Sequence, residues 1–159
     1  MNGYLTSLEE AVPALRRYAL AMLPSGRDAD DIVRRCLAKA IGRLHEAGDA
    51  AGMRVWLFAM MYRELARRGR QRRWGRLLSS FGNNVSAMAS TELARAFGGL
   101  PLEQRSAMFL ISVEDFSYAA AAEVMGMPTM TLVDLLKAGR EQLRRSTGAG
   151  ASVPPPTGS

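Results

Sequence analysis

The sequence has little of what catalytic and metal centres use. Its 159 residues include one cysteine, Cys36, and one histidine, His45. These counts exclude an internal disulfide framework and leave little for a zinc site or a histidine-based active centre. The longest fully apolar stretch, Val55 to Met61, is far shorter than the roughly 20 residues that cross a bilayer, and no export signal precedes it. We therefore expect a cytoplasmic protein that is not an enzyme, needs no cofactor or metal ion and is not inserted in a membrane.

Positive charge is plentiful but unevenly placed. The chain has 21 Lys and Arg against 15 Asp and Glu, a formal net charge of +6, and 48% hydrophobic residues, enough for a core. Residues 1–75 hold 14 Lys and Arg against 8 acids, whereas residues 91–159 hold 6 against 7. This asymmetry predicts two units with different partners.

Composition also predicts the boundaries of these units. Residues 77–90 are uncharged and rich in Ser, Gly and Asn, which is typical of a linker between a first domain, 1–76, and a second, 91–147. Residues 148–159 lack any core-forming pattern, so we expect a disordered tail. A flexible linker permits the two domains to pack together in the free protein without requiring it.

Hydrophobic periodicity predicts an all-α fold of two small helical domains, a three-helix domain and a helix-turn-helix domain. No segment alternates as a strand does. Ser7 and Glu10 have the spacing of a capping box, and Asp28, Ser117 and Thr129 are predicted N-caps. The predicted helices are about 7–23, 28–44, 51–73, 91–97, 101–114, 117–125 and 129–146.

Residues 118–137 have the layout of a helix-turn-helix. A small residue, Ala122, stands where two crossing helices touch, and Gly126 supplies a turn residue that tolerates positive φ. An ordinary helical hairpin is the alternative. The outward positions of the second helix include Met130 and Asp134, and neither suits contact with phosphate, so as an isolated DNA binder this unit looks weak.

An arginine cluster ends the first domain. Seven arginines within fourteen residues are interrupted by one acid, Glu64, and accompanied by Tyr62 and Trp74. Cations beside aromatic rings suit nucleic acid, because charge follows phosphate and rings stack on unpaired bases. The cluster favours a polyanion or an acidic protein surface over a merely solvated helix end. Its members are Arg63, Arg67, Arg68, Arg70, Arg72, Arg73 and Arg76.

Five segments together resemble a known family. They are Pro13–Ala19, Asp28–Val33, Arg54–Phe58, Leu100–Arg105 and Phe116–Gly126. In their order and spacing the chain resembles a divergent bacterial RNA polymerase sigma factor of the extracytoplasmic-function (ECF) type. The resemblance implies three binding surfaces and no covalent chemistry, since the polymerase is the enzyme.

The resemblance assigns each surface a set of residues. Binding to RNA polymerase core would use Asp28, Asp31, Arg34, Arg35 and Lys39. Binding to downstream promoter DNA would use Trp56, Tyr62, Arg63, Arg67, Arg68, Arg70, Arg72, Arg73 and Trp74. Contact with upstream promoter DNA would use Thr129, Met130, Val133, Lys137 and Arg140.

Departures from the family pattern fall on these same surfaces. Arg34 and Arg35 stand where the family usually has Gln and an acid, which reverses the charge there. Our first hypothesis is an alternative sigma factor that directs promoter-specific transcription, as in a stress response, under the control of an anti-sigma factor. The second is a sigma-like module that sequesters an anti-sigma factor without initiating transcription, as in some alphaproteobacterial response regulators, although their phosphoreceiver domain is not seen in this sequence. An unrelated helical DNA-binding protein is the third.

Overall fold

The fold is all-α, as predicted. The computed structural model describes residues 2–75 and 92–148, with the side chains of 2, 50 and 70–75 excepted, and these ranges contain no strand. The predicted linker, 77–90, and all of the predicted tail except residue 148 therefore lie outside the described residues. The elements are α1 (Asn2–Met22), α2 (Gly26–Ile41), the short 3-10 helix η1 (Leu44–Glu46), α3 (Ala50–Gly75), α4 (Glu92–Gly98), α5 (Leu102–Ser112), α6 (Tyr118–Met125) and α7 (Thr129–Ser146).

Two predicted helix starts in the N-terminal unit, which comprises α1–α3, are wrong. Ser25, in extended backbone, caps α2, and its hydroxyl accepts a hydrogen bond from the Asp28 amide at 3.2 Å. Asp28 instead lies in the first turn, where the helix dipole favours negative charge. The capping box at Ser7 does not form, because α1 already begins at Asn2 and continues through Pro13.

The C-terminal unit, α4–α7, follows the predicted signals more closely. Ser117 caps α6 and accepts from the Ala120 amide at 3.1 Å, as predicted. Gly126 ends α6 with φ 63°, a left-handed conformation that glycine adopts without a steric penalty. Thr129 is not an N-cap but the first residue of α7, since Pro128 holds the extended cap position.

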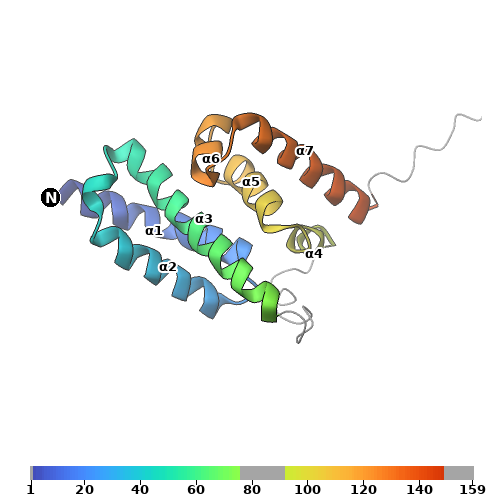
Figure 1. Ribbon diagram of the computed structural model, residues 1–159, viewed down its shortest axis with the longest axis horizontal. Coiled ribbons are helices and arrows are strands. Elements are labelled where there is room, and N and C mark those ends of the chain that lie inside the picture. Colours follow the sequence, from blue (N-terminus) through green and yellow to red (C-terminus); the bar gives the residue numbers. More distant parts are fainter. Residues whose placement is uncertain (1, 76–91, 149–159) are drawn as a thin grey trace, which may run out of the picture.

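The two units pack against each other and share one core. Helix α3 lies between α1–α2 on one side and α6 on the other, and α1 also touches α5 (Figure 1). Six consecutive residues of α3, Leu57 to Tyr62, are consequently buried, which one amphipathic stripe could not achieve. The helical periodicity predicts an inward face of α3 at Met53, Trp56, Leu57, Met60 and Met61. All of these are buried except Trp56, which is half-buried, and the second unit covers the rest of Leu57–Tyr62.

Within the C-terminal unit, α5 and α7 approach closely at Gly139. A Cβ atom placed on Gly139 would lie 2.8 Å from Met108 Sδ. Gly139 is buried, and its missing side chain leaves room for the side chain of Met108 on α5. This contact fixes α7 against α5 and therefore sets the direction in which α7 leaves the turn at Gly126.

Candidate partner-binding surfaces

An aromatic cluster joins the two units. Tyr18 of α1 lies between Phe58 of α3 and Phe109 of α5, with ring centroids 5.5 and 5.6 Å away. Phe58 in turn meets Phe116 edge to face at 5.1 Å. Tyr18 also donates a buried hydrogen bond to Ser106 Oγ at 2.8 Å. Apolar area and a matched polar pair therefore hold the units together.

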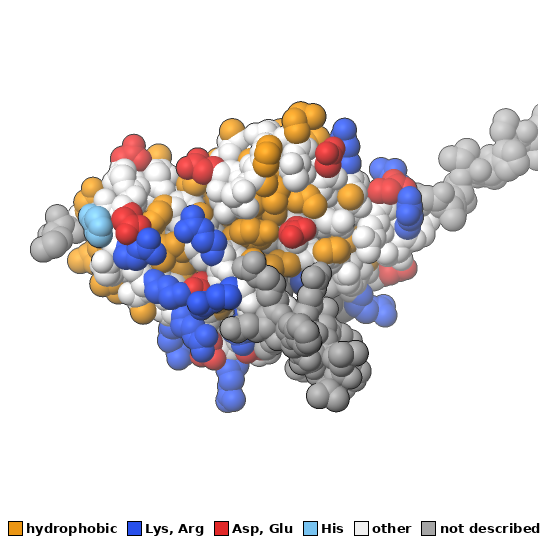
Figure 2. Space-filling view, viewed as in Figure 1, with side chains coloured by type: hydrophobic (Ala, Val, Ile, Leu, Met, Phe, Trp, Pro, Cys, Tyr) orange, Lys and Arg blue, Asp and Glu red, His pale blue; other side chains and the backbone are white. Residues whose placement is uncertain are grey.

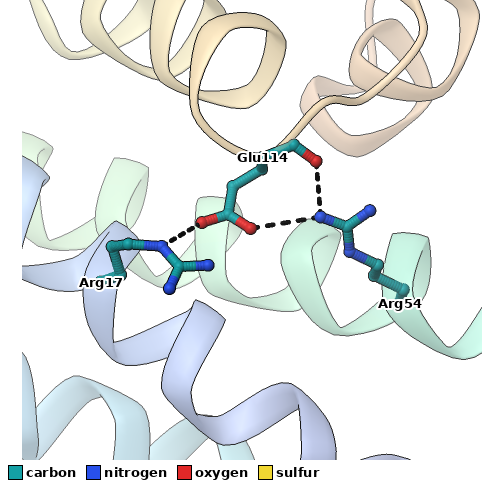
Figure 3. A network of polar contacts seen from close by, with 3 residues as sticks. All are labelled: Arg17, Arg54 and Glu114. Atoms are coloured by element: carbon teal, nitrogen blue, oxygen red, sulfur yellow. Dashed lines mark hydrogen bonds and ion pairs between the residues drawn. The ribbon is translucent and has the colours of Figure 1, made fainter.

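A buried carboxylate ties the same interface electrostatically. Glu114, 3% exposed in the loop after α5, accepts from Arg17 Nε of α1 at 2.7 Å and from Arg54 Nη2 of α3 at 3.2 Å (Figure 3). The guanidinium of Arg54 also lies 4.4 Å from the Phe116 ring centroid. The hydrogen bond and negative charge of Glu114 raise the pKa of Arg17. The sequence did not predict this network, because its members lie 60 and 97 residues apart.

Helices α6 and α7 have helix-turn-helix geometry. Their axes bend by 96° across the break at 126–128. Ala122 and Met125 are buried at the contact, and Leu132 and Leu136 of α7 complete the wedge. The predicted outward residues Thr129, Met130, Lys137 and Arg140 are exposed, and Val133 is half-buried. Met130 is 72% exposed, so an apolar side chain dominates the start of this face.

Cations from α2 and α3 gather on one face of the N-terminal unit (Figure 2). We call this the basic surface and define it by Arg34, Arg35, Lys39, Arg63, Arg67 and Arg68. Glu64 pairs with Lys39 and, at 2.7 Å, with Arg67, while Arg68 pairs with Asp28. Burial alone would raise the pKa of Glu64, but the hydrogen bonds and positive charges of Lys39 and Arg67 outweigh it and lower that pKa.

The basic surface brings together two predicted sets. The polymerase-binding residues, on α2, lie beside the described downstream-DNA arginines, on α3. A hollow of about 170 Å³ is lined by residues of both helices: Ile32, Arg35, Glu64, Arg67 and Arg68. Asp31 borders this surface, 3.9 Å from Arg34. The roles themselves stay predictions.

The predicted aromatic rings that the structure describes pack against the core. Tyr62 is buried and Trp56 is half-buried against the core, so neither ring faces solvent fully in this arrangement. The side chains of Arg70, Arg72, Arg73 and Trp74 lie outside the described part of the chain, as does Arg76. Of the arginines in this set, only the side chains of Arg63, Arg67 and Arg68 can therefore be placed.

In residues 2–75 and 92–148, no three His, Cys, Asp or Glu side chains are grouped so as to hold a metal ion. A second hollow, of about 210 Å³ between α1 and α3, is lined by Glu10, Met53, Arg54 and Phe58 among others. Among the described helices, none alone is long and apolar enough to cross a membrane; only the bent pair α6–α7 meets that test, on length and composition.

Two family models match the chain, one on each unit. The Sigma2 domain of PhyR matches residues 8–62, which run from α1 into α3. The sigma-like domain of the response regulator PhyR matches residues 100–145, which include α5, α6 and nearly all of α7. Both matches agree with the order of segments on which the resemblance was based.

Known proteins resemble the whole arrangement. The ECF RNA polymerase sigma factor EcfG of Rhodopseudomonas palustris (strain TIE-1) is 26% identical over 142 residues, covering 84% of this chain and 78% of EcfG. The sigma factor RpoE of Bartonella quintana, solved with the anti-sigma factor NepR, has a TM-score of 0.73 at 22% identity, covering 92% of this chain and 97% of RpoE.

Two further solved structures contain PhyR. PhyRSL of Sphingomonas sp. Fr1, solved with NepR, has a TM-score of 0.69 at 22% identity and covers 97% of this chain and 94% of that one. The anti-anti-sigma factor PhyR of Bartonella quintana, also solved with NepR, has a TM-score of 0.64 at 18% identity. That match covers 88% of this chain but 49% of PhyR, so the chain spans about half of that regulator.

Proposed function

Because the chain is a divergent sigma-factor-like protein of the ECF type, we propose that it is a protein-binding module that captures an anti-sigma factor and does not itself initiate transcription. Captured anti-sigma factor would no longer inhibit its sigma factor, so the module would act on transcription indirectly. Its chemistry is reversible association through helix faces.

One observation carries this proposal: the helix-turn-helix has no cation where DNA would be read. Between Arg105 and Lys137 the chain contains no Lys or Arg, whereas it contains Glu114, Asp115, Glu123 and Asp134. Phosphate contacts from Lys and Arg supply much of the affinity of DNA-binding proteins, and base reading needs donors at the start of the recognition helix. The exposed start of α7 supplies the hydroxyls of Thr129 and Thr131 but no Lys or Arg, and it adds an apolar Met130 and an acidic Asp134.

The relatives support a partner of the anti-sigma class. Both matching family models are described by PhyR, and the solved relatives from Bartonella quintana and Sphingomonas are complexes with NepR. Sigma factor RpoE and anti-anti-sigma factor PhyR are thus both partners of NepR in those structures. A module with this fold can compete with a sigma factor for one inhibitor because the two present similar surfaces.

An alternative sigma factor is the second candidate function. Its support is the 26% identity to EcfG over most of the chain, together with the arginines that α3 contributes to the basic surface. In that case the N-terminal unit would bind RNA polymerase core and melt promoter DNA, and α7 would contact the upstream element. Against this arrangement, the first part of α7, residues 129–136, contains Asp134 and no Lys or Arg.

Reconstitution separates the two functions. We expect the purified chain to form a 1:1 complex with the NepR-type anti-sigma factor of its own organism by size-exclusion chromatography and calorimetry. Added to an inhibited holoenzyme of the resident sigma factor, it should restore transcription in a dose-dependent way. Mixed with core polymerase alone, it should give no promoter-specific transcript.

The opposite results have clear meanings. Promoter-specific transcripts from the chain and core polymerase would replace the proposal with the sigma-factor function. No complex with the anti-sigma factor, and no relief of inhibition, would refute the proposal directly. The resident sigma factor is the matched positive control in both assays.

A further inference from the structure

We propose that the basic surface of α2 and α3 binds an acidic segment of the protein partner, which makes it a charge-selective part of the binding interface. This inference rests on the proposed function and adds to it the chemistry of the partner: carboxylates that project from a peptide segment toward Arg35, Arg63 and their neighbours.

The surface has positive charge to spare. Within the described residues, Arg35 and Arg63 are exposed and make no ion pair with a carboxylate. Arg34 meets Asp31 only at 3.9 Å and is largely in solvent. The remaining cations share two carboxylates, those of Glu64 and Asp28. Six cations against three acids, Asp28, Asp31 and Glu64, leave a surplus of positive charge that a partner can neutralise.

The internal pairs hold part of the surface ready for binding. Glu64 lies between Lys39 and Arg67 and orients both, while Asp28 orients Arg68 across from α2. The guanidinium groups of Arg67 and Arg68 line the same hollow as Arg35. An arginine fork that is already positioned binds a carboxylate with two parallel hydrogen bonds and loses less conformational entropy in doing so.

Three observations favour protein carboxylates over nucleic acid. The hollow contains the carboxylate of Glu64, and a second one, on Asp28, lies at its edge; a continuous phosphate backbone would be repelled by both. The ring of Tyr62 is buried and that of Trp56 is half-buried against the core, so neither ring offers a fully exposed face on which a base could stack. Helix α7 offers no cation before Lys137 to support a second DNA contact. A protein surface of mixed charge can instead complement the alternating cations and acids.

The test compares two double charge reversals. Arg35→Glu with Arg63→Glu removes the unpaired cations of the basic surface. Arg144→Glu with Arg145→Glu makes the same change in net charge at the end of α7, where both arginines are exposed. Calorimetry with the organism's NepR-type anti-sigma factor at 50 and 200 mM salt measures binding, and circular dichroism confirms that each variant is folded.

We expect the first variant to bind at least tenfold more weakly at 50 mM salt and to lose most of the salt dependence. The control variant should bind as the wild type does. If both variants bind the anti-sigma factor as tightly as the wild type does, the inference is wrong while the proposed function stands. If the wild type does not bind the anti-sigma factor, both are wrong.

A nucleic-acid arm completes the experiment. Fluorescence anisotropy with 20-nucleotide single-stranded and duplex DNA measures binding of the same proteins at the same salt concentrations. We expect DNA to bind more weakly than the anti-sigma factor. If DNA binds more tightly and the Arg35/Arg63 variant loses that binding, the basic surface is a nucleic-acid site and the inference is overturned.

Discussion

The side chain of Arg54 donates hydrogen bonds to both the main chain and the side chain of Glu114. The same nitrogen, Nη2, donates to the Glu114 carbonyl oxygen at 2.6 Å and to Oε2 at 3.2 Å. Arg17 donates a hydrogen bond to the other carboxylate oxygen of Glu114, Oε1. The loop that follows α5 is thus held by two helices of the other unit, and the adjacent residue, Asp115, has a positive φ of 54°. This loop therefore helps to fix the relative position of the two units, together with the aromatic cluster around Tyr18.

Glu114→Gln tests the strength of this network. The substitution keeps the size of the side chain but removes the charge that both arginines use. Hydrogen bonds to charged groups contribute about 1.5–3 kcal/mol, and both arginines are half in solvent, so we expect a loss of about 1–2 kcal/mol in the free energy of unfolding. Urea denaturation of the wild type and the variant measures this difference in the free energy of unfolding. Glu123→Gln, at an exposed site on α6, should change nothing.

Tyr18 and Ser106 provide a second test of the interface. Tyr18→Phe removes one hydroxyl from a buried pair and leaves Ser106 Oγ near Met22 Sδ. We expect each of Tyr18→Phe and Ser106→Ala to cost about 1 kcal/mol, because a net hydrogen bond contributes about that amount. The double variant should cost less than the sum of the two. Strict additivity in denaturant melts would show that the hydroxyls do not interact.

Local signals predicted the elements but not their assembly. Ser117 and Gly126 were predicted correctly because capping and left-handed turns depend on neighbouring residues. The sequence predicts Asp28 as the N-cap of α2, but several polar residues between 25 and 31 can serve as a cap. In the structure the hydroxyl of Ser25 caps the helix. No local pattern connects Glu114 with Arg17 and Arg54, since a partner 60 or 97 residues away has no sequence period.

The candidate site was predictable to a similar extent. The arginines of α3 stand out in the sequence, and so do Arg34 and Arg35 of α2. That the two groups form one surface follows only from the packing of α2 on α3 and from the pairs at Asp28 and Glu64. Likewise, Tyr62 was predicted beside the arginines, and the cover supplied by the second unit explains its burial.

Two glycines should respond oppositely to alanine. Gly69 lies on an exposed part of α3, and a Cβ there would have nothing within 4 Å. Gly69→Ala should raise the free energy of unfolding by about 0.5–1 kcal/mol, because glycine is a poor helix former. At Gly139 the same change forces Met108 to move and should lower stability. Thermal melts of the two variants compare them directly.

Cys36 reports unfolding through its reactivity. Burial, and to a smaller extent the charge of Glu64, raise the pKa of the Cys36 thiol to about 12. Thiolate is the reactive form, and an unfolded cysteine has a pKa near 8.5, approximately. At pH 8.5 we therefore expect iodoacetamide to modify the native chain far more slowly than the chain in urea. Equal rates would show that the thiol is accessible in the folded protein.

The same pKa shift gives a pH dependence. The folded state keeps the Cys36 proton up to about pH 12, whereas the unfolded chain releases it above its own lower pKa. The contribution of Cys36 to stability is thus complete below the unfolded pKa and is lost as the pH rises toward the folded one. Urea melts at pH 7.5 and 10 should show a smaller loss of stability in Cys36→Ala than in the wild type.

The shared core has a consequence for chain connectivity. Because Leu57–Tyr62 of α3 are covered by helices from both units, each unit made alone would expose apolar surface that its counterpart normally covers. Two separately encoded fragments, 1–83 and 84–159, should then find each other and reconstitute the fold without a covalent bond between them. Co-expression with a tag on one fragment would recover both, and Tyr18→Ala, which empties the centre of the junction, would reduce the yield of the untagged fragment.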